Sequence, residues 1–169
     1  MFGPGNNDIE YLVCGLQAQG INRLQLTDYN TVVKVVEMSK VNPSLGNTKV
    51  ILIRGTSVGS LTYAQRNNCC NFIKDENCGR PTDEHASSQV SGSRPGKPQQ
   101  KLPEFTCEVE ASCKWAKRGG WMIVEIEAQY LEKGDVGQAG WVCHYAAPIK
   151  VLAVVKHPKP VIGLTVNAD

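Results

Sequence analysis

Ser57 stands in the segment GTSVG at residues 55–59, which matches the Gly-x-Ser-x-Gly pattern of hydrolases that use a serine nucleophile. The segment follows an apolar stretch, Val50–Ile53, and precedes a stretch with helical spacing, so a tight turn would expose the hydroxyl near a helix N-terminus. Such a serine needs a histidine as its base, and His144 and His157 are the candidates. Both histidines fall in stretches with β character. We therefore expect Ser57 to occupy a structural turn and to perform no catalysis.

The longer string GTSVGSL, from residue 55, resembles the nucleophile loop of patatin-like hydrolases. The resemblance implies a mostly parallel sheet, a glycine-rich oxyanion loop before the serine, and a partner aspartate in an Asp-Gly pair. Residues 1–30 contain no such glycine cluster, and the nearest match to the pair is Asp135-Val136-Gly137. A small serine hydrolase using the GTSVG turn is therefore the third hypothesis for function.

Seven cysteines are a second source of possible chemistry. Cys69, Cys70 and Cys78 are followed by His85, but a structural zinc site usually presents two close pairs of ligands. Adjacent cysteines seldom both bind one tetrahedral ion, so we expect no metal and no cofactor. An odd number of cysteines in a chain that is large enough to fold without crosslinks favours reduced thiols over a disulfide framework.

A basic and aromatic segment follows in the C-terminal half, where we expect the tip of a β-hairpin. Nucleic-acid modules combine phosphate-binding cations with aromatic rings on which bases stack. The residues that could bind single-stranded nucleic acid in this way are Lys114, Trp115, Lys117, Arg118 and Trp121. The alternative is a solvated hairpin whose tryptophans anchor the core. A β-barrel module that binds single-stranded nucleic acid is the second hypothesis for function.

Composition sets limits on these possibilities. The chain has 169 residues, of which 41% are hydrophobic and 20% are charged, as is usual for one globular domain. Its net charge of +2 is too small to indicate a polyanionic partner. We expect no membrane association, because no apolar run approaches the roughly 18 residues of a membrane span. The N-terminal residues lack the pattern of a secretory signal, so we expect a cytoplasmic location or an assembled particle.

Strict alternation of apolar and polar residues predicts the elements that would position these groups. Cys107, Val109, Ala111 and Cys113 share one parity, and the alternation resumes from Trp121. Side chains on a strand point alternately to its two faces, so this pattern indicates antiparallel strands with one face buried. The expected strands are Ile9–Cys14, Thr31–Met38, Lys49–Ile53, Phe105–Cys113, Trp121–Leu131, Trp141–Ala146, Ile149–Lys156 and Val161–Val166.

The expected fold is all-β or β-dominated, an antiparallel β-sandwich or barrel of about eight strands in a single domain over residues 1–169. Leu61–Lys74 is the one predicted helix, with Ser60 or Thr62 as its cap. Asp28 could cap another helix beginning at Tyr29, but four valines within the next seven positions favour a strand.

A long polar loop interrupts the domain at residues 79–103, which are rich in Pro, Gly, Ser and Gln. We expect neighbouring subunits to hold this loop, with its cations at the contacts: Arg80, Arg94, Lys97 and Lys101. The leading hypothesis is therefore a non-enzymatic, self-assembling structural protein that forms a homo-oligomer, such as a capsid, tail or decoration subunit of a virus or phage.

Overall fold

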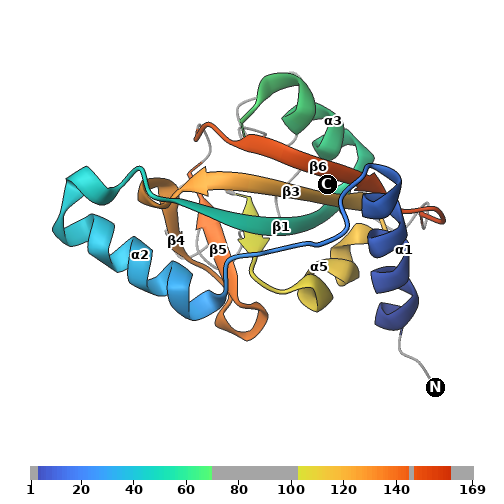
Figure 1. Ribbon diagram of the computed structural model, residues 1–169, viewed down its shortest axis with the longest axis horizontal. Helices are drawn as coiled ribbons and strands as arrows, with labels where there is room; N and C mark the ends of the chain where they lie inside the picture. Colours follow the sequence, from blue (N-terminus) through green and yellow to red (C-terminus); the bar gives the residue numbers. More distant parts are fainter. Residues whose placement is uncertain (1–3, 70–102, 145–146, 161–169) are drawn as a thin grey trace, which may run out of the picture.

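The computed structural model describes residues 4–69, 103–144 and 147–160. Within these residues, one antiparallel sheet has the strand order β4-β5-β2-β1-β3-β6 (Figure 1). Its strands are β1 (Lys49–Ser57), β2 (Glu104–Thr106), β3 (Gly119–Glu127), β4 (Leu131–Lys133), β5 (Gly140–Cys143) and β6 (Lys150–Lys156). The β-rich, antiparallel character is confirmed. The sheet is open, however, because β4 and β6 do not pair with each other, and the described residues form no closed barrel.

The described part of the chain also contains more helix than expected. Its α-helices are α1 (Pro4–Ala18), α2 (Tyr29–Val41), α3 (Val58–Asn67) and α5 (Val109–Ala116). Helix α3 corresponds to the predicted helix but begins earlier, because the side chain of Ser57 accepts a hydrogen bond from the backbone N–H of Ser60 and caps it. None of the described helices is long and apolar enough to cross a lipid bilayer.

The predicted strand Thr31–Met38 is wrong, since these residues belong to α2. Asp28 caps this helix: its carboxylate accepts hydrogen bonds from the backbone N–H of Thr31, at 3.1 Å, and from the Thr31 hydroxyl, at 2.7 Å. The helical penalty of valine is a few tenths of a kcal/mol per residue, whereas a cap contributes about 1 kcal/mol. Burial of Val32 and Val36, one turn apart, adds more.

Two further strand predictions are wrong for a similar reason. Ile9–Cys14 lies in α1, where Leu12 and Leu16 are buried one turn apart. The expected strand Phe105–Cys113 ends at Thr106 and is followed by α5. The buried residues of α5 have the spacing of a helix face and not the predicted alternation: Ser112, Cys113 and Ala116.

The expected strands around Lys49, Trp121, Trp141 and Ile149 are confirmed as β1, β3, β5 and β6. β1 and β3 pair without interruption from Lys49↔Glu127 to Ser57↔Gly119. A 3-10 turn, Ala128–Tyr130, divides the predicted strand Trp121–Leu131 and separates β3 from β4. The predicted strand Val161–Val166 and residues 145–146 lie outside the described residues.

Both faces of the sheet are covered, which explains why β3 is buried on both sides. On one face α2 and α3 pack over Leu52, Met122 and Val124. On the other face α1 and α5 pack over Ile53, Trp121 and Ile123. Figure 1 shows α2 and α3 at different ends of the sheet and α1 beside α5. The molecule therefore has two hydrophobic clusters separated by the sheet.

Strand β1 joins two halves of the sheet. It pairs with β2 at a single register position, Ile53↔Thr106. Arg54 strengthens this contact, because its Nη1 donates to the backbone oxygen of Glu104 at 2.8 Å and its guanidinium lies 5.9 Å from the Phe105 ring centroid. We call this boundary between β1 and β2 the seam.

Candidate functional site

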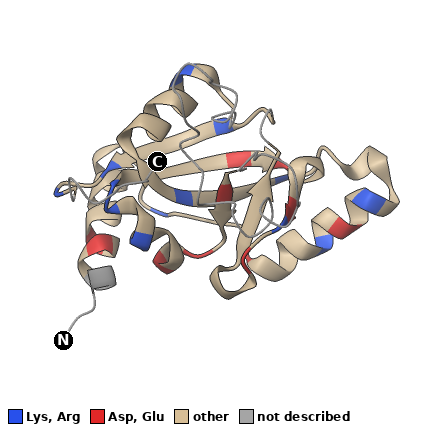
Figure 2. Ribbon diagram, turned by 180° about the vertical axis from the view of Figure 1, so that it is seen from behind, with Lys and Arg blue, Asp and Glu red and all other residues tan. Residues whose placement is uncertain are grey.

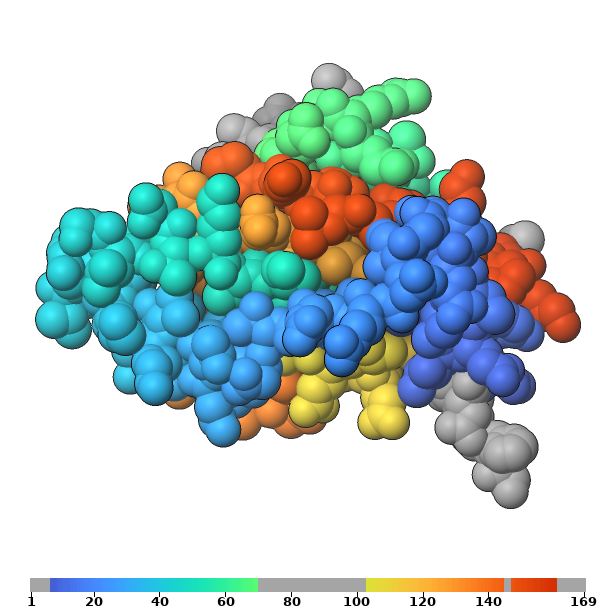
Figure 3. All heavy atoms as spheres, viewed as in Figure 1, coloured from blue at the N-terminus to red at the C-terminus, as the bar shows by residue number. Residues whose placement is uncertain are grey.

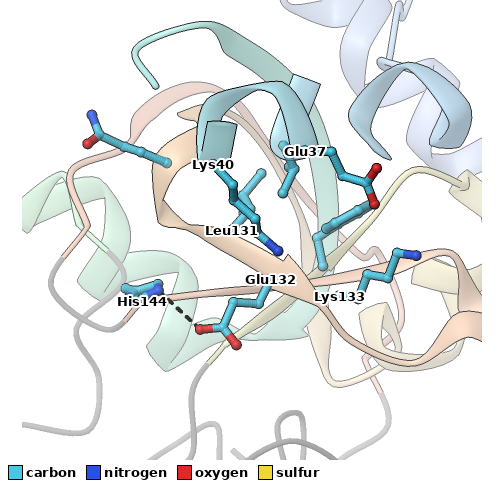
Figure 4. A pocket seen from close by; sticks show the side chains of 9 residues that line it. Glu37, Lys40, Leu131, Glu132, Lys133 and His144 are labelled. Atoms are coloured by element: carbon cyan, nitrogen blue, oxygen red, sulfur yellow. Dashed lines mark ion pairs between the residues drawn. The ribbon is translucent and has the colours of Figure 1, made fainter. Parts of the chain in front are cut away.

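A pocket of about 690 Å³ lies where α2 crosses β4 and β5. Figure 4 shows it from close by. Helix α2, the 3-10 turn before β4, β4 itself and β5 with the residue that follows it all contribute. The lining residues are Val36, Glu37, Lys40, Gln129, Leu131, Glu132, Lys133, Trp141 and His144.

Helix periodicity and strand pairing place these side chains together. Lys40 follows Glu37 by three residues and Val36 by four on α2, so it is a neighbour of both on the helix surface. Glu132 pairs with Val142 across the β4–β5 ladder, and the backbone N–H of His144 donates to the oxygen of Tyr130 at 3.0 Å. The packing of Val36 of α2 in one hydrophobic cluster with Leu131 and Trp141 brings the helix to this corner of the sheet.

The charged groups of the pocket have both signs. Glu132 Oε2 lies 3.3 Å from His144 Nε2, and their side chains are 45% and 52% exposed. In Figure 4 the Lys40 side chain extends from α2 toward β4, and Lys133 of β4 lines the pocket as well. The pocket thus offers two ammonium groups, an imidazole and carboxylates within a space of small-molecule size.

The floor of the pocket is apolar and buried. Leu131 and Trp141 are buried, and the ring of Tyr29 lies 5.4 Å from that of Trp141. Burial raises the pKa of the nearby Cys107 thiol to about 11, although the indole N–H of Trp141 favours the thiolate. Cys107 is therefore a neutral thiol at pH 7 and belongs to the core.

The GTSVG segment has a structural explanation at Ser57 and at Gly55. Ser57 Oγ accepts from the backbone N–H of Ser60 at 3.2 Å and lies 3.3 Å from its hydroxyl. Gly55 lets α5 approach β1, because a Cβ there would lie 2.6 Å from the backbone nitrogen of Ala116. Within the described residues, no hydrogen bond joins Ser57 to a histidine.

The second histidine, His157, belongs to a buried polar network. Its Nδ1 accepts from the backbone N–H of Lys159 at 3.0 Å, so Nε2 carries the proton and donates to Asp8 Oδ1 at 2.8 Å. Asp8 Oδ2 accepts from Lys117 Nζ at 2.8 Å. The ring of Trp121 stacks on His157, with centroids 5.6 Å apart. Both imidazole nitrogens are occupied, which leaves none to act as a base.

The charge of Asp8 is maintained inside the protein by its partners. Burial opposes ionisation of this carboxyl, but the hydrogen bonds from Lys117 and His157, together with the charge of Lys117, hold its pKa below its usual value. The network joins α1, the turn after α5 and the end of β6. These buried hydrogen bonds therefore hold the three elements together.

The predicted nucleic-acid residues occupy the end of α5 and the turn into β3, not a β-hairpin tip. Lys117 is bound to Asp8, and Trp121 is fully buried. Trp115 lies between two cations, with Lys114 Nζ at 5.2 Å and Arg118 Cζ at 5.0 Å from its ring centroid. Figure 2 shows Lys and Arg interspersed with Asp and Glu on the face it presents, including along α2.

Other predicted site residues cannot be placed. Arg80, Arg94, Lys97 and Lys101 lie outside the described residues, as do Cys70, Cys78 and His85. The five cysteines in the described part are free thiols: Cys14, Cys69, Cys107, Cys113 and Cys143. The described residues contain no group of three or more His, Cys, Asp and Glu side chains that could hold a metal ion.

No pattern in the sequence points to the pocket, although His144 is a candidate base there. The spacing of Glu37 and Lys40 could have indicated a shared helix face, had α2 been recognised. Among curated proteins, no match was found. A family model, described as a domain of unknown function (DUF4765), matches residues 27–158, a range that includes every lining residue of the pocket. The chain belongs to this DUF4765 family.

Proposed function

We propose that this domain binds a small zwitterionic ligand in the pocket between α2, β4 and β5, without chemical conversion. The observation that carries the proposal is the arrangement of Lys40, Glu132 and His144 around an apolar floor in a space of about 690 Å³. Ligand sites of this size typically combine apolar walls with a few polar groups that fix orientation.

The two signs of charge indicate the class of ligand. An anionic group, such as a carboxylate, would approach Lys40 and the His144 imidazole. A cationic group, such as an amine, would approach Glu132 or Glu37. Short peptides and amino-acid conjugates are small molecules that carry both kinds of group. The pocket accommodates several more atoms than a free amino acid, so we favour a short peptide terminus or a conjugate.

The side chains that line the pocket support binding more than catalysis. A histidine with a carboxylate beside it can act as a general base. Covalent catalysis with such a base requires a hydroxyl or thiol nucleophile within hydrogen-bond reach, and the described lining residues include neither. His144 and Glu132 are also about half exposed, so water competes for their charges.

A set of three probes tests the proposal by isothermal titration calorimetry. Glycyl-leucine carries both charges, its N-acetyl form carries only the carboxylate, and its amide carries only the ammonium. We expect the zwitterion to bind most tightly. Lys40→Gln should weaken binding of the two carboxylate probes about fivefold, which corresponds to about 1 kcal/mol for a solvent-accessible charge. Glu132→Gln should weaken binding of the two ammonium probes by a similar factor.

Lys34→Gln is the matched control, because Lys34 is an exposed lysine on α2 that does not line the pocket. It should leave all three affinities unchanged. Equal affinities for the three probes, or equal effects of Lys34→Gln and Lys40→Gln, would contradict the proposal. If mass spectrometry shows that a probe has been chemically altered after the titration, the protein would be an enzyme instead.

Self-assembly and binding of single-stranded nucleic acid stay predictions. Assembly would depend on the loop at residues 79–103. Nucleic-acid binding would rest on Lys114, Trp115 and Arg118, because Lys117 and Trp121 are engaged within the protein. Light scattering with absorbance at 260 and 280 nm separates the two, since it reports particle mass and bound nucleic acid together.

A further inference from the structure

A groove of about 590 Å³ lies on the opposite side of the sheet from the pocket. It runs between α1, the segment Ile21–Leu26 and the beginning of α5, and Figure 3 shows these three elements on one face of the molecule. Ile9, Leu12, Val13 and Leu16 line one wall, with the spacing of a single helix face. Leu12 and Leu16 belong to the core, but Val13 is 44% exposed. The groove thus has a fixed floor and an accessible apolar wall.

The opposite wall offers backbone groups. Residues 21–28 have no regular secondary structure and cross the face of the sheet as a long extended segment (Figure 1). Ile21 and Thr27 make backbone hydrogen bonds at the two ends. Between them, the backbone groups of residues 22–26 make none with the described residues. Such a row of donors and acceptors can pair with an added chain.

The rim is acidic at one end. Glu108 and Glu110 are exposed and line the groove where α5 begins. Glu108 occupies the N-cap position, but its side chain makes no capping hydrogen bond. Neither carboxylate forms an ion pair within the described part of the chain. Two carboxylates beside an apolar floor favour a partner that carries a positive charge next to apolar side chains.

We propose that this groove docks an extended segment of a partner protein, with apolar side chains at alternate positions and a lysine or arginine at one end. The apolar side chains lie against Leu12, Val13 and Val109. The backbone of the segment pairs with residues 22–26, and the basic side chain approaches Glu108 and Glu110. The combination of a backbone ladder with an apolar wall fits a peptide better than a lipid or a small molecule.

Three synthetic peptides test the proposal on the full chain by two-dimensional NMR. The first, acetyl-Lys-Gly-Leu-Thr-Val-Thr-Leu-Gly-amide, has the proposed pattern. The second replaces lysine with glutamate, and the third replaces Leu, Val and Leu with serine. We expect the lysine peptide to shift the amide signals of Leu24 and Leu26 and to bind at least fivefold more tightly than the glutamate peptide. The serine peptide should cause no shifts.

Variants at the rim provide the decisive comparison. The double variant Glu108→Gln and Glu110→Gln should abolish the preference for the lysine peptide, whereas Glu10→Gln should leave it unchanged. Glu10 is an exposed carboxylate of α1 that does not line the groove. Equal binding of the lysine and glutamate peptides, or shifts outside this face, would overturn the proposal. Concentration-dependent shifts of the same amides without peptide would also overturn it, because the occupant would then be a second copy of the chain.

Discussion

The two histidine–carboxylate pairs of this protein have similar chemistry and opposite surroundings. His157 and Asp8 lie 2.8 Å apart, and each side chain is 5% exposed. His144 and Glu132 lie 3.3 Å apart, and about half of each side chain is exposed. The buried pair has further partners in Lys117 and the backbone of Lys159, whereas the other pair borders a pocket. The saturated pair stabilises the fold, and the exposed pair is available to a ligand.

The largest expected difference between the pairs is in stability. Asp8→Ala should lower the free energy of unfolding by about 3 kcal/mol, because it leaves the buried His157 and the Lys117 ammonium without their acceptor. Glu132→Ala should cost no more than about 0.5 kcal/mol, as is usual for an exposed ion pair. Urea denaturation monitored by tryptophan fluorescence measures both. Similar losses in the two variants would contradict the distinction between a structural and a binding pair.

A smaller difference should appear in the dependence of stability on pH. The pKa of Asp8 is lower in the folded protein than in the unfolded chain, so its contribution is present above a pH of about 4 and is lost as the pH falls through the folded value. Within that window the unfolded state binds more protons, and the contribution changes by up to about 1.4 kcal/mol per pH unit.

Comparison of the wild-type protein with Asp8→Asn isolates this effect. Other carboxyls titrate in the same range, and burial raises the pKa of Glu104, which changes stability in the opposite direction. These contributions are common to both proteins and cancel in the difference. The free energies of unfolding of the two proteins, measured by denaturation between pH 2 and 7, should therefore converge as the pH falls. A difference in free energy of unfolding that stays constant with pH would mean that Asp8 is not charged in the folded state.

The smallest expected effect is the coupling between His144 and Glu132. A double-mutant cycle with His144→Ala and Glu132→Ala should give a coupling free energy of about 0.5 kcal/mol or less, because both groups are solvated. Addition of 0.5 M NaCl should reduce it further, as screening acts on exposed charges. A coupling above about 1.5 kcal/mol would show that this pair is structural as well, and would remove the contrast.

The strands that could be predicted from the sequence are those in which alternation reflects real burial. β3 is long and paired on both sides, and Met122, Val124 and Ile126 pack on one face as their parity predicts. The other face is polar only at Glu125 and Glu127, since Trp121 and Ile123 are buried there. In α5 the same parity was misleading, because Val109 and Cys113 also lie four residues apart, on one face of a helix. Short apolar segments satisfy both periods, and only tertiary packing decides between them.

The candidate site could not be predicted for a different reason. The ligand-binding potential of Lys40 depends on Glu132 and His144, which are brought to it by the crossing of α2 over the sheet. No local pattern encodes such a long-range contact. Cap signals were present in the sequence but were not followed: Asp28 was a possible cap that was set aside for a strand, and it caps α2 in the structure. The weight given to the valines after it obscured that signal. The cap of α3 is Ser57 rather than the expected Ser60 or Thr62.

The seam between β1 and β2 has a mechanical consequence. On one side of it β1, β3 and β6 form a long ladder, while on the other side β2, β4 and β5 are three or four residues long and meet β1 at one position. Cooperative unfolding units tend to divide where few contacts cross. The corner that contains the pocket can therefore loosen as a unit while the long ladder stays intact. Amide hydrogens of β4 and β5 should then exchange with solvent by this partial opening, and a ligand held there would slow that exchange.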